Sequence, residues 1–133
     1  MQRLAPQWLA GCRLREIWFE PTFHKHAGQL CAGLQIHVDS PSYQHAEFRP
    51  WRLMALAFKA IRQSHAQYPL WRDFAYEYEH DRLAIDLING GPMLREWVDD
   101  PAAQAGDLEQ AVAADEAAWR ADIQDLLLYP CSD

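Results

Sequence analysis

A segment in the first third of the chain alternates apolar and polar side chains. Over residues 33–39 the apolar residues Leu34, Ile36 and Val38 alternate with the polar residues Gln35, His37 and Asp39. A period of two is typical of a β-strand, because successive side chains of a strand point to opposite faces. The pattern therefore predicts a strand with one apolar and one polar face.

Two further segments are rich in β-branched and aromatic residues, as strands usually are. Residues 14–19 predict a strand that stops before Pro21, since proline cannot donate a hydrogen bond to a sheet. Residues 20–32 then form a loop. Residues 74–79 predict a third strand, after a break at Tyr68, Pro69 and Leu70.

Helical spacing of apolar residues predicts two helices around these strands. Residues 2–10 predict a short helix that closes at Gly11, where glycine allows the left-handed turn. A longer helix is expected from Pro50 to about His65, because the fixed φ of proline suits a first helical position. Its predicted buried stripe is Met54, Ala57, Phe58 and Ile61.

The second half of the chain predicts three more helices. One passes through residues 83–88 and ends at 89–91, and one runs from Pro92 to about Val98. Asp107 and Gln110 resemble a capping box that opens a last long helix to about Leu128. Its predicted inner face is Val112, Trp119, Ile123, Leu126 and Leu127.

Strands that come early and helices that come late favour an α+β fold over a regular βαβ alternation. We expect a small mixed sheet of about three or more strands packed against several helices, with a long C-terminal helix. At 133 residues, half of them hydrophobic, the chain is expected to form a single domain over 1–133.

The charge of the chain is divided unevenly along its length. The net charge is −7, with nine Lys or Arg against four Asp or Glu in residues 1–72, and three against fifteen in residues 73–133. The acidic total argues against a general nucleic-acid binder. Three cysteines, Cys12, Cys31 and Cys131, show no CxxC spacing and indicate neither a disulfide framework nor a zinc knuckle. No signal peptide or membrane span is evident, so the compartment stays open.

The loop over residues 24–33 is the leading candidate site. It gathers His24, Lys25, His26 and Cys31 between small residues that let a ligand approach the backbone. The loop leads into the polar face of the next strand, where Gln35, His37 and Asp39 are expected to point the same way, about 6 to 7 Å apart.

Other chemistry is open at the same residues. A metal site would use His24, His26 and His37 with Cys31 or Asp39, and a thiol nucleophile would use Cys31 with His37. No phosphate-binding loop or GxSxG elbow occurs. We expect neither a metal nor another cofactor.

Acidic residues and arginines in the second half raise two further possibilities. A pair of carboxylates for glycoside hydrolysis would come from Asp39, Glu77, Glu79, Asp81 and Asp86, although spacing alone cannot pair them. Arg82 and Arg95 are able to clamp a carboxylate bidentately, or to form structural salt bridges.

One run of residues resembles the hallmark segment of the exo-β-N-acetylmuramidase family. The run is Phe19, Pro21, Phe23, His24, Lys25, Gly28, Cys31, Gly33, Gln35, His37 and Val38. Further matches follow in order: Phe48, Pro50, Tyr68, Pro69, Tyr76, Glu77, Tyr78, Ile85, Asp86, Leu87, Gly90, Arg95, Trp119, Leu127, Leu128 and Tyr129. The similarity spans nearly the whole chain and is to the C-terminal domain of that family.

The resemblance implies a function and a partner. Family members have an N-terminal Rossmann-like domain, absent here, and a cleft between the two domains. They release terminal N-acetylmuramic acid from the non-reducing end of peptidoglycan fragments during cell-wall recycling, often outside the cytoplasm. The catalytic glutamate is expected on the other domain, so this chain is expected to supply no catalytic residue. His24, Lys25, Gln35, His37 and Arg95 would line the cleft and contact the saccharide.

The chain departs from the family pattern after His37 and Val38. Asp39 and Ser40 stand where relatives commonly show Thr and then Asp, which puts any role of Asp39 in doubt. Two alternatives to the muramidase hypothesis stay open. One is a stand-alone interaction or homodimerising module without catalysis, and the other is a small metal-binding protein.

Overall fold

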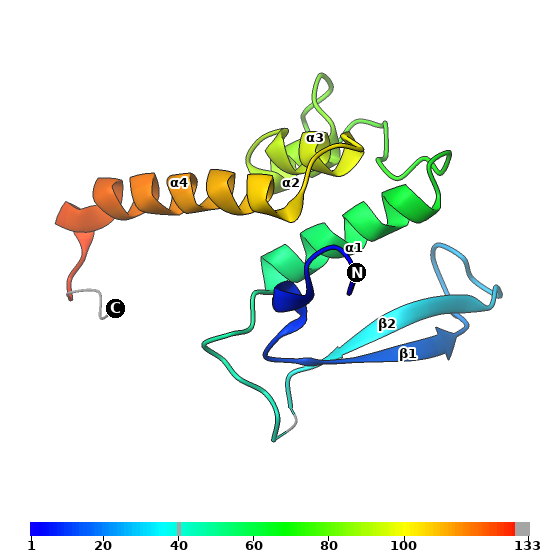
Figure 1. The fold of residues 1–133 in the computed structure, drawn as a ribbon. Coiled ribbons are helices and arrows are strands. Elements are labelled where there is room, and N and C mark those ends of the chain that lie inside the picture. Colours follow the sequence, from blue (N-terminus) through cyan, green and yellow to red (C-terminus); the bar gives the residue numbers. More distant parts are fainter. Residues whose placement is uncertain (40, 130–133) are drawn as a thin grey trace. The chain divides into compact units, whose positions relative to one another are not determined.

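The computed structural model describes residues 1–39 and 41–129, and it divides the chain into two compact units (Figure 1). Unit 1 comprises Met1–Ala60 and unit 2 comprises Ile61–Asp133. Ser40 and Cys131 lie outside the described residues. The expectation of a single domain stays a prediction.

Unit 1 is built around one antiparallel β-hairpin. A short 3₁₀ turn, η1 (Pro6–Leu9), precedes strand β1 (Arg13–Phe19), which pairs along its whole length with β2 (Cys31–His37). Figure 1 shows the two strands side by side, joined by the loop over residues 20–30. Both predicted strands are confirmed. The helix predicted over residues 2–10 is only a 3₁₀ turn at its C-terminal end.

The sheet of the described residues has two strands and is antiparallel, so the prediction of a mixed sheet with a third strand was wrong. Residues 74–79 instead form a tight turn, in which Tyr76 and Glu79 exchange backbone hydrogen bonds of 3.1 and 3.0 Å. Glu77 between them has a left-handed φ of 53°. A strand cannot pass through this conformation, although the aromatic residues around it favour one.

On β2 the apolar face of the hairpin is the more exposed one. Leu34 is 50% exposed and Ile36 38% exposed, and Trp18 on the same face is 66% exposed. Gln35 and His37 on the polar face are half-buried. The alternation of β2 is therefore present as predicted, but solvent meets its hydrophobic side.

The long helix α1 (Pro50–Ser64) begins at Pro50 as predicted, but it buries a different stripe. Its buried residues are Leu53, Ala55, Leu56 and Lys59. Met54 and Ile61, which were predicted to be buried, are 45% and 39% exposed. Apolar residues occupy every position from 53 to 58, so periodicity does not select one face. The buried Lys59 also hides the true stripe from a hydrophobic pattern.

Unit 2 contains three helices that begin in the described part of the chain after α1. They are α2 (Ala84–Asn89), α3 (Met93–Asp99) and α4 (Ala105–Ile123), which continues into the 3₁₀ turn η2 (Gln124–Leu126). Helix α2 ends at Gly90 with a φ of 81°, the left-handed C-terminal glycine that the sequence predicts. These helices confirm the α+β class and the long C-terminal helix.

Helix α4 begins earlier than predicted. The Gln104 backbone N–H donates to the Asp107 carboxylate Oδ2 at 2.7 Å, so Gln104 caps the helix and Asp107 lies in its first turn. The predicted box of Asp107 and Gln110 was therefore placed three residues too late. A carboxylate in the first turn also interacts favourably with the positive end of the helix dipole, which favours a helix start at this position.

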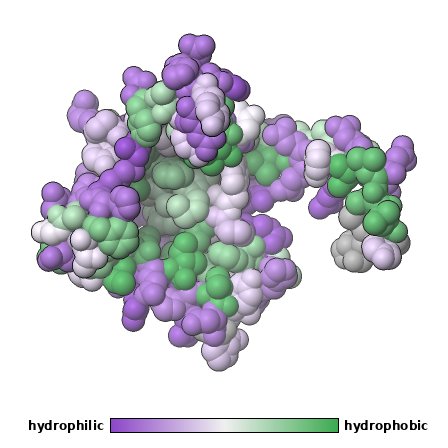
Figure 2. Space-filling model, turned by 180° about the vertical axis from the view of Figure 1, so that it is seen from behind, coloured by the Kyte–Doolittle hydropathy of each residue, from purple (hydrophilic) through white to green (hydrophobic). Residues whose placement is uncertain are grey.

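The predicted inner face of α4 was also wrong for its C-terminal half. Leu108 is the buried residue of the helix, whereas Trp119 is 64% exposed and Leu126 after it is 77% exposed. Figure 2 shows hydrophobic residues gathered on the surface at this end of α4. The other predicted residues of this face, Val112, Ile123 and Leu127, are half-buried, so the predicted stripe is covered only in part.

Two glycines with the same backbone conformation test the packing of unit 1. Gly11 and Gly28 have φ of 76° and 72°, but a Cβ on Gly11 would lie 2.6 Å from the Phe48 nitrogen, and one on Gly28 would meet nothing within 4 Å. Gly28→Ala is expected to lower the free energy of unfolding by about 1–2 kcal/mol, the cost of a left-handed L residue. Gly11→Ala adds an overpacking cost of roughly 1–3 kcal/mol.

Urea unfolding of both variants measures this difference. Equal losses for the two variants would contradict the close approach of Gly11 to the backbone at Phe48.

Candidate functional site

The register of the hairpin decides which side chains share its polar face. Arg13 is paired with His37, and Arg15 with Gln35. Directly paired residues of an antiparallel sheet point to the same face. The Arg15 guanidinium Nη2 donates to the Gln35 side-chain oxygen at 2.5 Å, which confirms this placement. Two arginines therefore lie among the polar residues that the sequence predicted.

The same face becomes apolar toward the loop. Ile17 is paired with Gly33, and Phe19 with Cys31. A Cβ on Gly33 would lie 3.1 Å from the Phe19 ring, so the ring lies against the strand where glycine leaves room for it. Phe19 remains 45% exposed. The polar face thus has a cationic end and an aromatic end.

The loop that joins the strands holds His24 and Lys25, both exposed. His24 and His26 have left-handed φ of 61° and 60°, and the Gly28 N–H closes the loop by donating to the Pro21 carbonyl at 2.9 Å. The structure therefore brings His24 and Lys25 together at one end of β2 and places Gln35 and His37 toward the other. Cys31 and His37, the two ends of β2, are six residue steps apart, which corresponds to about 20 Å.

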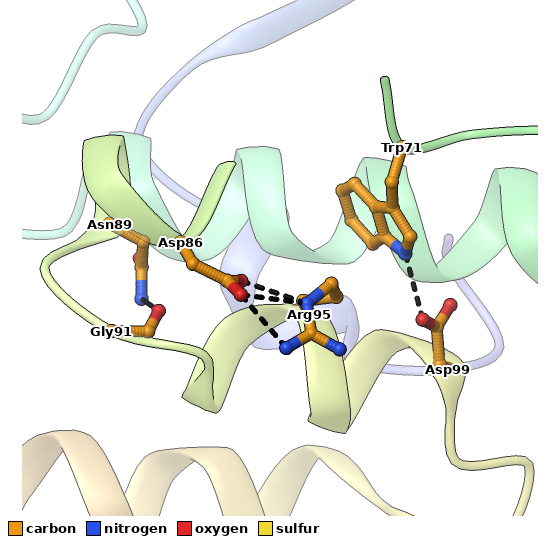
Figure 3. Close-up of polar contacts among 6 residues, drawn as sticks. All are labelled: Trp71, Asp86, Asn89, Gly91, Arg95 and Asp99. Atoms are coloured by element: carbon orange, nitrogen blue, oxygen red, sulfur yellow. Dashed lines mark hydrogen bonds and ion pairs between the residues drawn. The ribbon is translucent and has the colours of Figure 1, made fainter. Parts of the chain in front are cut away.

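Arg95, the remaining predicted site residue, forms an ion pair within unit 2 (Figure 3). Its Nε donates to the Asp86 Oδ1 at 2.8 Å and its Nη2 to Oδ2 at 2.8 Å. The hydrogen bond to Asp86 also raises the pKa of Arg95. This bidentate contact fastens α2 to α3. A structural salt bridge was one of the two uses of Arg95 that the sequence allowed.

A second carboxylate in unit 2 organises the segment after α1. The Asp99 carboxylate accepts from the Trp71 indole N–H at 2.8 Å (Figure 3). It also accepts from the Arg62 Nε at 2.8 Å. Arg62 also donates to the Tyr68 carbonyl at 2.9 Å. Sequence reasoning missed this network, because its members are 28 and 37 residues apart in the chain.

The comparisons with known proteins bear on the residues that carry this geometry. A family model described as exo-beta-N-acetylmuramidase NamZ, C-terminal, matches residues 1–129. The chain belongs to this family. No curated protein and no solved structure matches it. The resemblance drawn from the hallmark segment is confirmed, and the chain is a C-terminal domain of this muramidase family.

The metal and thiol alternatives find little support in this muramidase domain. The described residues contain no group of three or more His, Cys, Asp or Glu side chains that is able to hold a metal ion. His37 instead contacts Asp39 at 3.5 Å through its Nδ1. The thiol of Cys31, the nucleophile considered, donates to the Gln29 carbonyl at 3.5 Å.

The carboxylates considered for glycoside hydrolysis are engaged in part. Glu79 accepts from Arg82 at 2.6 Å, and this hydrogen bond, helped by the Asp81 N–H, lowers the pKa of Glu79. A general acid needs the opposite shift. Asp86 is held by Arg95.

No helix in the described residues combines the length and apolar character that crossing a membrane requires.

The two ion pairs predict different losses of stability. Arg95→Ala leaves Asp86, whose side chain is 13% exposed, without its partner, and is expected to lower the free energy of unfolding by about 1–2 kcal/mol. Arg82→Ala breaks a pair in which Arg82 is 64% exposed, and is expected to cost much less because water replaces the contact. Thermal or urea unfolding measures both, and similar losses would show that the Asp86 contact does not join α2 to α3.

Proposed function

We propose that this chain forms one wall of the substrate cleft of an exo-acting β-N-acetylmuramidase. The enzyme would release terminal N-acetylmuramic acid from peptidoglycan fragments. The observation that supports the proposal is the family match over residues 1–129. An N-terminal Rossmann-like domain carries the catalytic glutamate in this proposal, and the saccharide binds between the domains.

The hairpin and its loop supply suitable groups for such a wall. Lys25 offers a flexible ammonium for the lactyl carboxylate of N-acetylmuramic acid. The imidazoles of His24 and His37 and the amide of Gln35 offer hydrogen bonds for hydroxyl and N-acetyl groups. These residues extend along the hairpin rather than around one point, so the proposed wall contacts an extended saccharide. Arg95 contributes indirectly in this proposal, by holding α3 to α2 through Asp86.

The proposal predicts binding without turnover. In an NMR titration with a muramyl disaccharide, we expect shifts at Lys25, Gln35 and His37, and we expect no chromophore release from a chromogenic N-acetylmuraminide. Gln35→Ala is expected to weaken binding several-fold, since one or two hydrogen bonds are worth about 0.5–1.5 kcal/mol each. Gln63→Ala, an exposed glutamine on α1, is the matched control.

Two results would contradict the proposal. One is the absence of any saccharide-dependent shift in the hairpin. The other is robust hydrolysis by this chain that Glu77→Gln or Asp86→Asn abolishes, because the catalytic carboxylate would then lie here.

The exposed apolar face of the hairpin favours a second candidate function, self-association. Trp18, Leu34, Ile36 and Val38 are 66%, 50%, 38% and 46% exposed. Glu16 lies opposite Leu34 on the same face. Exposed apolar side chains that gather on one face are often covered by a partner, and a two-stranded sheet has two open edges. In this second proposal the partner is another copy of the chain, and the module has no catalytic role.

Self-association predicts a mass that depends on protein concentration. Light scattering after size exclusion is expected to approach the dimer mass for the wild type, and to remain at the monomer mass for Leu34→Lys, because a buried unpaired ammonium opposes the contact. Ile88→Lys, at a 68% exposed residue of α2, is the matched control and is expected to behave as the wild type. A wild type that stays monomeric at millimolar concentration excludes this candidate.

A further inference from the structure

The arginines of the two units differ in their partners. In unit 2, Arg62, Arg82 and Arg95 each form an ion pair with a carboxylate. In the hairpin, Arg13 and Arg15 have no carboxylate partner among residues 1–39 and 41–129, and Arg15 contacts only the neutral Gln35 oxygen. Asp39 is the acidic residue beside this face, and its carboxylate contacts His37.

The spacing of the two arginines concentrates positive charge. They are two residues apart on one strand, so they share a face at about 6 to 7 Å, and like charges at that distance repel. His37 lies opposite Arg13 in the register. An anion between the guanidiniums would relieve the repulsion and accept several charge-assisted hydrogen bonds.

The next positions along the face suit a different part of a ligand. Ile17 and Gly33 follow the Arg15 pair, and the Phe19 ring lies against Gly33. Aliphatic and aromatic side chains pack against the C–H face of a sugar ring, and the glycine lets the ring approach the strand. A cationic group and an apolar floor are therefore separated by one strand repeat, about 6 to 7 Å.

We propose that Arg13 and Arg15 form a carboxylate subsite for a sugar acid, with Ile17 and Phe19 as the floor for its ring. The two arginines lie at the opposite end of the hairpin from Lys25, and the apolar floor runs from them toward the loop. Arg13 and Arg15 would therefore bind the carboxylate of a different sugar unit from the one proposed for Lys25. The inference rests on the proposed function for the class of ligand, a saccharide that carries a carboxylate, and adds the two residues that distinguish it from a neutral sugar.

The test compares two sugars that differ in the carboxylate. N-acetylmuramic acid carries the lactyl group, and N-acetylglucosamine has the same ring without it. NMR titration of the full chain follows the Nε–H signals of Arg13 and Arg15 and the amides of Ile17 and Phe19. In the wild type we expect the arginine signals to move with N-acetylmuramic acid only, and the amides to move with both sugars.

Substitution then assigns the effect to charge. Arg13→Ala with Arg15→Ala is expected to weaken the binding of N-acetylmuramic acid roughly tenfold or more, since hydrogen bonds between charged groups are worth about 1.5–3 kcal/mol. Binding of N-acetylglucosamine is expected to stay unchanged. Arg13→Lys with Arg15→Lys keeps the charge and is expected to recover part of the affinity. Arg3→Ala, an exposed arginine before the hairpin, is the matched control.

Each remaining outcome overturns the inference in a recognisable way. Unchanged binding of N-acetylmuramic acid by the double alanine variant removes the subsite and leaves the proposed function standing. An equal loss of affinity for both sugars in the double alanine variant would show that the arginines maintain the structure of the hairpin and do not bind the carboxylate. If the hairpin signals of the wild type respond to neither sugar, the hairpin does not bind such saccharides. The proposed function then fails together with the subsite.

Discussion

The pairing of β1 with β2 is the constraint on which the rest of unit 1 depends. Because side chains alternate along a strand, a shift of one residue in the register would exchange the two faces of β2 relative to β1. The observed register places Arg15 with Gln35 and Ile17 with Gly33. Arg13, Arg15, Gln35 and His37 therefore share one face. Leu34, Ile36 and Trp18 share the other face, together with Glu16.

The sequence predicted the elements that short-range patterns along the chain determine. The alternation of residues 33–39 and the glycine end of α2 at Gly90 follow from local rules, and both are present. The buried stripe of α1 does not follow from such rules. Lys59 lies in that stripe at 2% exposure, a position that no hydrophobic period indicates, because a long aliphatic stem is able to pack where its charge is separately satisfied.

The site shows the same division between local and non-local information. Gln35 and His37 were found because they alternate within one strand, and their common face is present. Arg13 and Arg15 were missed because their relation to these residues is a cross-strand one, fixed by hydrogen-bond register rather than by spacing. Arg95 was selected as a clamp for a carboxylate and by resemblance, and its carboxylate partner Asp86 became visible only when α2 and α3 were placed together.

Arginines that have a carboxylate partner stabilise the fold of this chain, whereas arginines without one are available to bind a ligand. Carboxylates in unit 2 hold Arg62 and Arg95, which therefore fix segments of the chain at the cost of their freedom to bind anything else. In the part of the chain that the structure describes, the hairpin has two guanidiniums without a carboxylate partner on one face and exposed apolar side chains on the other. Both arrangements cost stability in an isolated chain, by repulsion and by hydration of apolar area. A surface that retains both costs is better explained by contacts with other molecules than by the folding of this chain.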